Sequence, residues 1–163
     1  MKYKEGLPAG RQAFSLLEAV IYIAILSLIA VVVIESVFSL YRAYGRTRVE
    51  RRLSLNGDAA IERIVRELRE AASTDPAGSS FGVSPGVLSA GGKIFSLAGV
   101  GGPLQIGSEE ITSDVDVTSL YFYRQSTSTP SEIIKIEITL SAGEGSFLKT
   151  KNFYGSAVLR KKY

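Results

Sequence analysis

A single carboxylate near the start of a long apolar run is the residue of this chain whose chemistry most needs explaining. Glu18 is followed by an almost wholly apolar stretch through Ile34, and residues 14–40 contain neither Gly nor Pro. About 20 apolar residues of helix cross the hydrocarbon core of a membrane, and a charge inside that core is costly without a partner. An amine would serve, and cutting the chain just before Phe14 would create one a single helical turn from Glu18.

The residues around the apolar run form a recognisable pattern. A short charged leader ends in the small residue Ala13, Phe14 begins the run, and Glu18 is the fifth residue after that boundary. This pattern resembles the cleavage and methylation signature of type IV prepilins and type II secretion pseudopilins. The resemblance implies cleavage between Ala13 and Phe14, N-methylation of Phe14, and a role for Glu18 in subunit assembly. The family usually has Gly before the cut, where this chain has Ala13.

The resemblance also implies partners and a location. The expected partners are a prepilin peptidase, other pilin or pseudopilin subunits, an inner-membrane assembly platform and membrane lipid. The chain would span the bacterial inner membrane once, with its N-terminus in the cytoplasm and its folded part outside, and would then enter a filament. The uninterrupted helix, the Arg- and Glu-rich stretch after it and the lack of Cys look most like a minor subunit of the J type.

Positive charge flanks the apolar run on both sides. In the leader, three cations against one acid give a balance of +2: Lys2, Lys4 and Arg11 against Glu5. After the run, five cations against one acid give +4: Arg42, Arg46, Arg48, Arg51 and Arg52 against Glu50. A plain count would place the second flank inside, whereas the leader signature places the N-terminus inside, and we expect the latter.

The function of the five arginines is open from sequence. They could contact lipid phosphates, acidic neighbours along a fibre, or DNA. The run Tyr121-Phe122-Tyr123-Arg124 would suit DNA through base stacking and charge, although alternating aromatics in a strand more often pack across strands.

Composition argues against catalysis. The chain has no Cys and no His, which removes disulfides, thiol catalysis, the commonest general base and the commonest metal ligand. No nucleophile–base pair or phosphate loop emerges, so we expect no enzyme, no cofactor and no metal site. A cluster of acids could still hold calcium, although its spacing is not that of an EF-hand: Glu109, Glu110, Asp114 and Asp116.

The elements that must position Glu18 follow from periodicity. We expect a leader over residues 1–13, a transmembrane and filament-core helix over 14–40, an amphipathic continuation over 41–74 and an antiparallel β head over 75–163. Apolar residues recur at steps of three and four through residue 72, and Ser73 to Pro76 should end the helix. Gly45 and Gly57 leave room for a bend or break.

The remaining sequence predicts strands. The strongest are expected over residues 115–124, 132–140, 147–153 and 157–160, with loops and short strands over 78–102. In the second of these, Ile134, Ile136 and Ile138 share one face, which is the period of a half-buried strand. We therefore expect an α+β, pilin-like fold in which a long helix packs against a small antiparallel sheet.

A different class of function fits the same composition. The chain could be a single-pass, membrane-anchored β domain that acts as a monomeric binding or sensor module with an uncut N-terminus. A mature species beginning at Phe14 would favour the filament subunit, and an intact Met1 would favour the anchored module.

Overall fold

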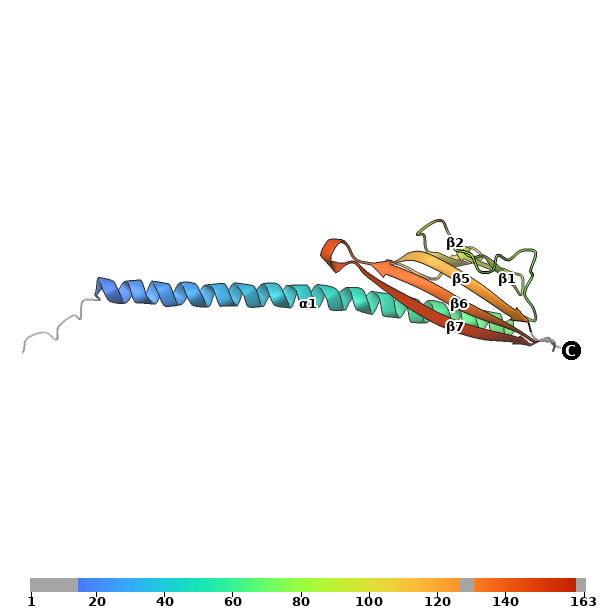
Figure 1. Ribbon diagram of the computed structural model, residues 1–163, viewed down its shortest axis with the longest axis horizontal. Helices are drawn as coiled ribbons and strands as arrows, with labels where there is room; N and C mark the ends of the chain where they lie inside the picture. The colour runs from blue at the N-terminus through green and yellow to red at the C-terminus, as the bar shows by residue number, and fades with distance from the viewer. Residues whose placement is uncertain (1–14, 127–130, 161–163) are drawn as a thin grey trace, which may run out of the picture. The chain divides into compact units, whose positions relative to one another are not determined.

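The computed structural model describes residues 15–126 and 131–160 of the 163-residue chain. Its class is α+β, as expected, with one long apolar N-terminal helix and two antiparallel sheets (Figure 1). The chain divides into two compact units, Met1–Ala43 and Tyr44–Tyr163, and the boundary between them lies inside the helix. We call the second unit the head. Every strand of the described residues belongs to it.

Helix α1 spans Leu16–Glu70, and its two parts are helical for different reasons. The first part lacks Gly and Pro and is rich in Leu, Ile and Ala. The second part is amphipathic, and its buried residues recur at steps of three or four as predicted: Leu53, Gly57, Ala60, Ile64 and Leu68. The helix continues through Gly45 and Gly57, where the sequence left room for a break.

The helix ends at Glu70, slightly before the stop expected from the sequence. The backbone N–H of Ala71 still donates to the carbonyl of Glu67 at 3.2 Å. Thr74 then forms a β-bridge with Ala90 and donates from its N–H and hydroxyl to Glu132. These tertiary bonds lead the backbone out of the helix before the proline at 76 could do so.

The larger sheet has the order β5-β6-β7, with both pairs antiparallel, and the strands lie side by side in Figure 1. Their bounds are Asp116–Ser126, Ser131–Ala142 and Lys149–Arg160, and a 3₁₀ turn at Gly145–Phe147 precedes β7. The predicted alternation in β6 is confirmed, because Ile134, Ile136, Ile138 and Leu140 are all buried.

The prediction of two C-terminal strands, over residues 147–153 and 157–160, was wrong. One strand, β7, pairs with β6 in an unbroken register from Lys149 to Arg160. Gly155 lies in the gap between the two predicted strands. In the fold, a Cβ at Gly155 would lie 2.7 Å from Cγ2 of Ile61, so the strand needs a residue without a side chain where α1 crosses it.

A second sheet has the order β1-β2-β3-β4; its first two strands fall in the region 78–102, expected to hold loops and short strands, and its last two lie beyond that region. Its bounds are Leu88–Ala90, Lys93–Leu97, Leu104–Ile106 and Glu109–Glu110. Gly91 and Gly92 join β1 to β2, both with positive φ, which two-residue hairpins require.

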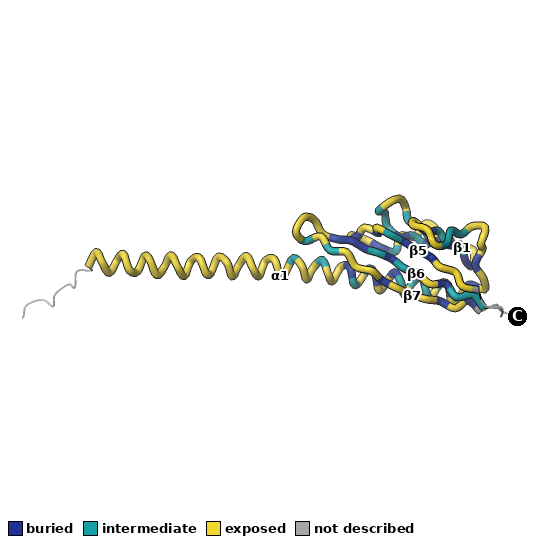
Figure 2. The backbone as a smooth tube through the Cα atoms, in the orientation of Figure 1, coloured by how far each residue is buried: buried dark blue, intermediate teal, exposed yellow. Residues whose placement is uncertain are grey.

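One hydrophobic core unites the head. It draws on the C-terminal part of α1 and on both sheets, and the buried hydrophobic residues of the described chain all fall between Leu53 and Leu159 (Figure 2). Because the chain has no Cys, this packing is not reinforced by disulfides. All described residues before Gly45 are exposed, so none of them belongs to this core.

Candidate functional site

The candidate site is the apolar part of α1 and the acid at its start. Glu18 lies in the first turn of the helix, where the positive end of the helix dipole favours a carboxylate. The Tyr22 hydroxyl, one turn further on, donates a hydrogen bond to Oε1 of Glu18 at 3.2 Å. Both side chains are exposed. The predicted cleavage and methylation residues, Ala13 and Phe14, lie outside the described residues.

The surface around Glu18 is apolar, and no other part of the described chain covers it. The large hydrophobic side chains from Leu16 to Tyr44 range from 49% exposed, at Ile21, to 83% exposed, at Leu16. By length and composition this helix could cross a membrane, and none of its apolar window is buried. Some signal sequences and some core helices of soluble proteins have the same length and apolar composition. The complete exposure here separates this helix from a core helix.

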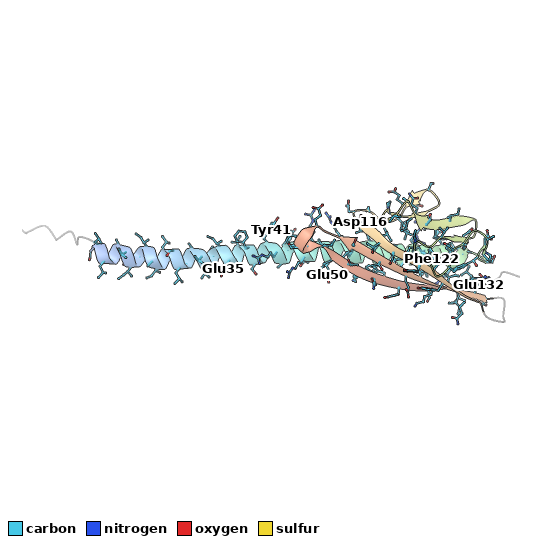
Figure 3. The ribbon with its side chains drawn as sticks, turned by 45° about the horizontal axis from the view of Figure 1, so that its top comes forward. Glu35, Tyr41, Glu50, Asp116, Phe122 and Glu132 are labelled. Atoms are coloured by element: carbon cyan, nitrogen blue, oxygen red, sulfur yellow. The ribbon has the colours of Figure 1, made fainter. Side chains whose placement is uncertain are left out.

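Two serine hydroxyls within the apolar part donate to carbonyl groups of the helix itself. Ser27 donates to the carbonyl of Ala24 and Ser36 to the carbonyl of Val32, both at 2.8 Å. Backbone-directed bonds of this kind let serine enter an apolar environment without an unpaired polar group. The charged residue Glu35 is different. In the part of the chain that the structure describes, its carboxylate has no hydrogen bond or ion pair, and it projects from the helix in Figure 3.

The five arginines expected to flank the membrane are all exposed on α1. The acid among them, Glu50, accepts a hydrogen bond from Nζ of Lys149 at 2.8 Å, so its charge is paired within the head. Arg52 lines a polar hollow with Asp114, Asp116 and Glu144. The remaining arginines have no ion pair within residues 15–126 and 131–160.

The structure separates the aromatic and basic run at 121–124. Phe122 is buried in the core, whereas Tyr121 and Tyr123 stack on the other face of the sheet with ring centroids 6.1 Å apart. The guanidinium of Arg124 lies 2.6 Å from Glu132 and is neutralised there. The linear sequence suggested that the charge of Arg124 and the aromatic rings would act together, but Arg124 and the stacked tyrosines lie on opposite faces of the sheet.

The acid cluster is likewise dispersed over several elements. Glu109 and Glu110 form β4, Asp114 lies in the following loop with positive φ, and Asp116 begins β5. Glu109 pairs with Arg63 at 3.2 Å. Among the described residues, no group of three or more acidic side chains is arranged to hold a metal ion.

Sequence reasoning missed three arrangements. The first is the Tyr22–Glu18 bond, which the four-residue spacing could have revealed. The second is the clasp formed by Thr74, Arg124 and Glu132, whose members are far apart in sequence. Burial alone would raise the pKa of Glu132, but hydrogen bonds from Arg124 and Thr74 outweigh it and hold that pKa below its ordinary value.

A third missed feature is the exposed face of the larger sheet. Nζ of Lys135 lies 2.7 Å from Glu137, and 5.7 Å and 6.0 Å from the ring centroids of Tyr123 and Tyr154. The Glu137 hydrogen bond raises the pKa of Lys135. Tyrosines beside an ammonium group are typical of surfaces that contact other molecules.

Comparisons with known proteins leave the family of this chain undetermined. No family model, curated protein or solved structure matches it. The evidence for function therefore rests on the residues and the geometry above.

Proposed function

We propose that this chain is a pilin-like structural subunit that is processed by a prepilin peptidase and assembled into a type IV pilus or a type II secretion pseudopilus. The observation that carries the proposal is the division of α1. Its first part exposes nearly every large hydrophobic side chain, while its second part is built into the core of the head. A helix of this kind must be covered by lipid or by other copies of the same helix.

Glu18 is the residue on which the proposed assembly depends. Cleavage between Ala13 and Phe14, followed by methylation of the Phe14 amine, produces a cation at the start of the apolar run. In a bundle of such helices, the Glu18 carboxylate of one subunit forms an ion pair with the Phe14 amine of its neighbour. A pair about 4 Å apart in a water-free site is far stronger than the same pair in water, so it sets the register between subunits.

The proposed location follows from the same elements. The subunit waits in the bacterial inner membrane with its N-terminus in the cytoplasm and its head outside, next to an assembly platform and the other pilin or pseudopilin subunits. Extraction from lipid exposes the apolar part of α1, and burial against other subunits then drives packing. The resemblance favours a minor subunit that helps to start the filament at its tip.

Mass spectrometry and filament isolation test the proposal in the native host. The mature chain should begin at Phe14, with a methyl group on its amine, and should be found in sheared filaments. Glu18→Gln should lower filament incorporation without lowering the amount of chain in the membrane. Glu62→Gln, which removes an exposed acid of the head, is the matched control. An uncut leader together with chain-free filaments would refute the proposal.

A second candidate is a monomeric, membrane-anchored binding module. The observation that favours it is the exposed sheet face with Lys135 between Tyr123 and Tyr154. This module would keep Met1 and would tolerate Glu18→Gln. The same two measurements therefore separate the candidates.

A further inference from the structure

Glu35 is an acid in the first part of α1 that has no hydrogen bond or ion pair among the described residues. The serines on either side of it bond to backbone carbonyls, and Glu18 accepts a bond from Tyr22. In the described part of the chain the Glu35 carboxylate has no partner, and it is surrounded by exposed hydrophobic residues such as Ile34 and Phe38. Once that apolar surface is covered by protein, an unpaired carboxylate there is expensive.

Arg42 is the cation best placed to satisfy Glu35, but not within one molecule. It lies seven residues further along α1, which is about two turns, so both side chains belong to the same stripe of the helix. The two positions are about 10 Å apart along the axis, too far for a direct ion pair within one helix. Arg42 also has no ion pair among the described residues.

We propose that Glu35 of one copy forms an ion pair with Arg42 of an adjacent, parallel copy in the assembled filament. This inference rests on the proposed function, and it names a second copy of this chain as the partner of the helix face. Two adjacent copies suffice, at the tip or in the shaft. The argument is charge complementarity: the stripe carries the acid Glu35 and, two turns away, the cation Arg42, neither of which has an ion pair among the described residues.

The required displacement agrees with the register that Glu18 demands. If the Phe14 amine of an outer copy lies level with Glu18 of an inner copy, the outer copy is displaced by four residues. Glu35 of the outer copy is then level with position 39 of the inner copy. Arg42 of the inner copy is three residues further on, about 4.5 Å, a span that long side chains bridge within single helices at the same spacing.

Both pairs therefore require displacement in the same direction. A displacement of four residues aligns the Phe14 amine with Glu18, and one of seven residues aligns Glu35 with Arg42. A value between the two leaves both pairs within reach of their side chains. Arg46 lies on nearly the same stripe, but pairing it with Glu35 would need a displacement of about eleven residues, which would separate Glu18 from the amine. The register thus selects Arg42 over Arg46.

In the membrane the pair is unnecessary. Glu35 is 19 residues beyond Leu16, which is about 28 Å along the helix, so its carboxylate can reach the headgroup region at the far side of the hydrocarbon core. Arg42 is further out still. Removal from lipid takes both groups away from the headgroups. The pair between Glu35 and Arg42 therefore contributes in the filament, where it replaces those headgroup contacts.

Charge reversal tests the pair in the native host. Glu35→Arg alone and Arg42→Glu alone should each lower the fraction of chain in sheared filaments by about tenfold or more, because each leaves like charges at the contact. The double variant should restore incorporation to near the wild-type level. Arg46→Glu is the matched control and should not rescue Glu35→Arg. Membrane level and leader cleavage are measured for each variant, so that an insertion defect is recognised.

Cysteine cross-linking tests the contact directly, because the chain contains no Cys. Two differently tagged copies, one with Glu35→Cys and one with Arg42→Cys, should be joined into a dimer in filaments by a short bismaleimide cross-linker, because an ion pair of two long side chains leaves the Cβ atoms farther apart than a direct disulfide allows. Glu35→Cys with Arg46→Cys should give much less.

The outcomes separate this inference from the proposed function. If wild-type chain enters filaments while single reversals also enter normally and the Glu35–Arg42 cross-link is absent, the inference is wrong and the proposed function stands. If wild-type chain never enters filaments, both are wrong. Rescue by the double variant together with the predicted cross-link would support the inference.

Discussion

Carboxylates in this chain meet two kinds of environment, and their surroundings decide what each can do. Glu18 and Glu35 are exposed on an apolar helix, where their partners must come mainly from outside the chain. Glu132 is different, because its side chain is only 19% exposed and its two oxygens accept bonds from Arg124 and Thr74. It therefore belongs to the stability of the head, and its ionised form is the one that those donors favour.

Glu132→Gln should destabilise the head by about 1 to 2 kcal/mol at neutral pH, because charge-assisted bonds become neutral ones. The pKa of Glu132 is lowered from its ordinary 4.5, so its stabilisation is present above that value and is lost as the pH falls through the folded-state pKa. The difference between wild type and variant should therefore shrink in acid. Urea unfolding of the head at several pH values measures it.

The control for this prediction is Glu62→Gln, an exposed acid on α1, which should change stability by less than about 0.5 kcal/mol at any of these pH values. An equal loss for Glu132→Gln at neutral and acid pH would show that ionisation of Glu132 does not contribute.

At the scale of elements, the contact between α1 and β7 depends on glycine in both. A Cβ at Gly57 would lie 2.2 Å from the Phe153 ring, and one at Gly155 would meet Ile61. These positions let helix and strand approach closely, at the cost of poorer propensity in each element. Packing against the sheet outweighs the local preference.

Gly57→Ala should destabilise the head by about 1 to 3 kcal/mol, although Ala is the better helix former by about 1 kcal/mol. The buried Phe153 ring would have to move to make room. Gly99→Ala is the control, because nothing lies within 4 Å of the added Cβ, and it should be close to neutral. Stabilisation by Gly57→Ala in chemical unfolding would contradict the close contact.

At the scale of the whole molecule, the hydrophobic core lies in the head, and the exposed apolar part of α1 lies in the other unit. Every buried hydrophobic residue of the described chain lies in the head, while the helical residues before Tyr44 are all exposed. The head therefore contains the hydrophobic core, and the described part of the first unit is a helix that could cross a membrane by its length and composition.

A fragment of residues 44–163 should be soluble without detergent and should unfold cooperatively on heating, as measured by circular dichroism. The full chain should require detergent or lipid, because its apolar helix would be exposed to water. A fragment of residues 62–163, which lacks Leu53, Gly57 and Ala60, is the control and should not fold stably. Aggregation of the 44–163 fragment without a cooperative transition would contradict the division of the chain.

Much of this organisation is legible in the sequence because it depends on local periodicity. The apolar run after Glu18, the stripe that begins at Leu53 and the alternation in β6 each follow from one residue's neighbours along the chain. The same local pattern predicted a membrane-length helix and an α+β class. The proposed cleavage and assembly chemistry also derives from the sequence, and the structure leaves it as a proposal.

Tertiary structure decided the features that join distant segments. Gly155 lies inside one continuous strand, at a position where Ile61 of α1 comes too close for a side chain. Thr74, just after the helix, is held in a β-bridge with Ala90 and donates hydrogen bonds to Glu132, 58 residues away. Local sequence cannot encode such contacts, since each depends on which surfaces the folded chain brings together, and the packing energy they release exceeds the local preferences they override.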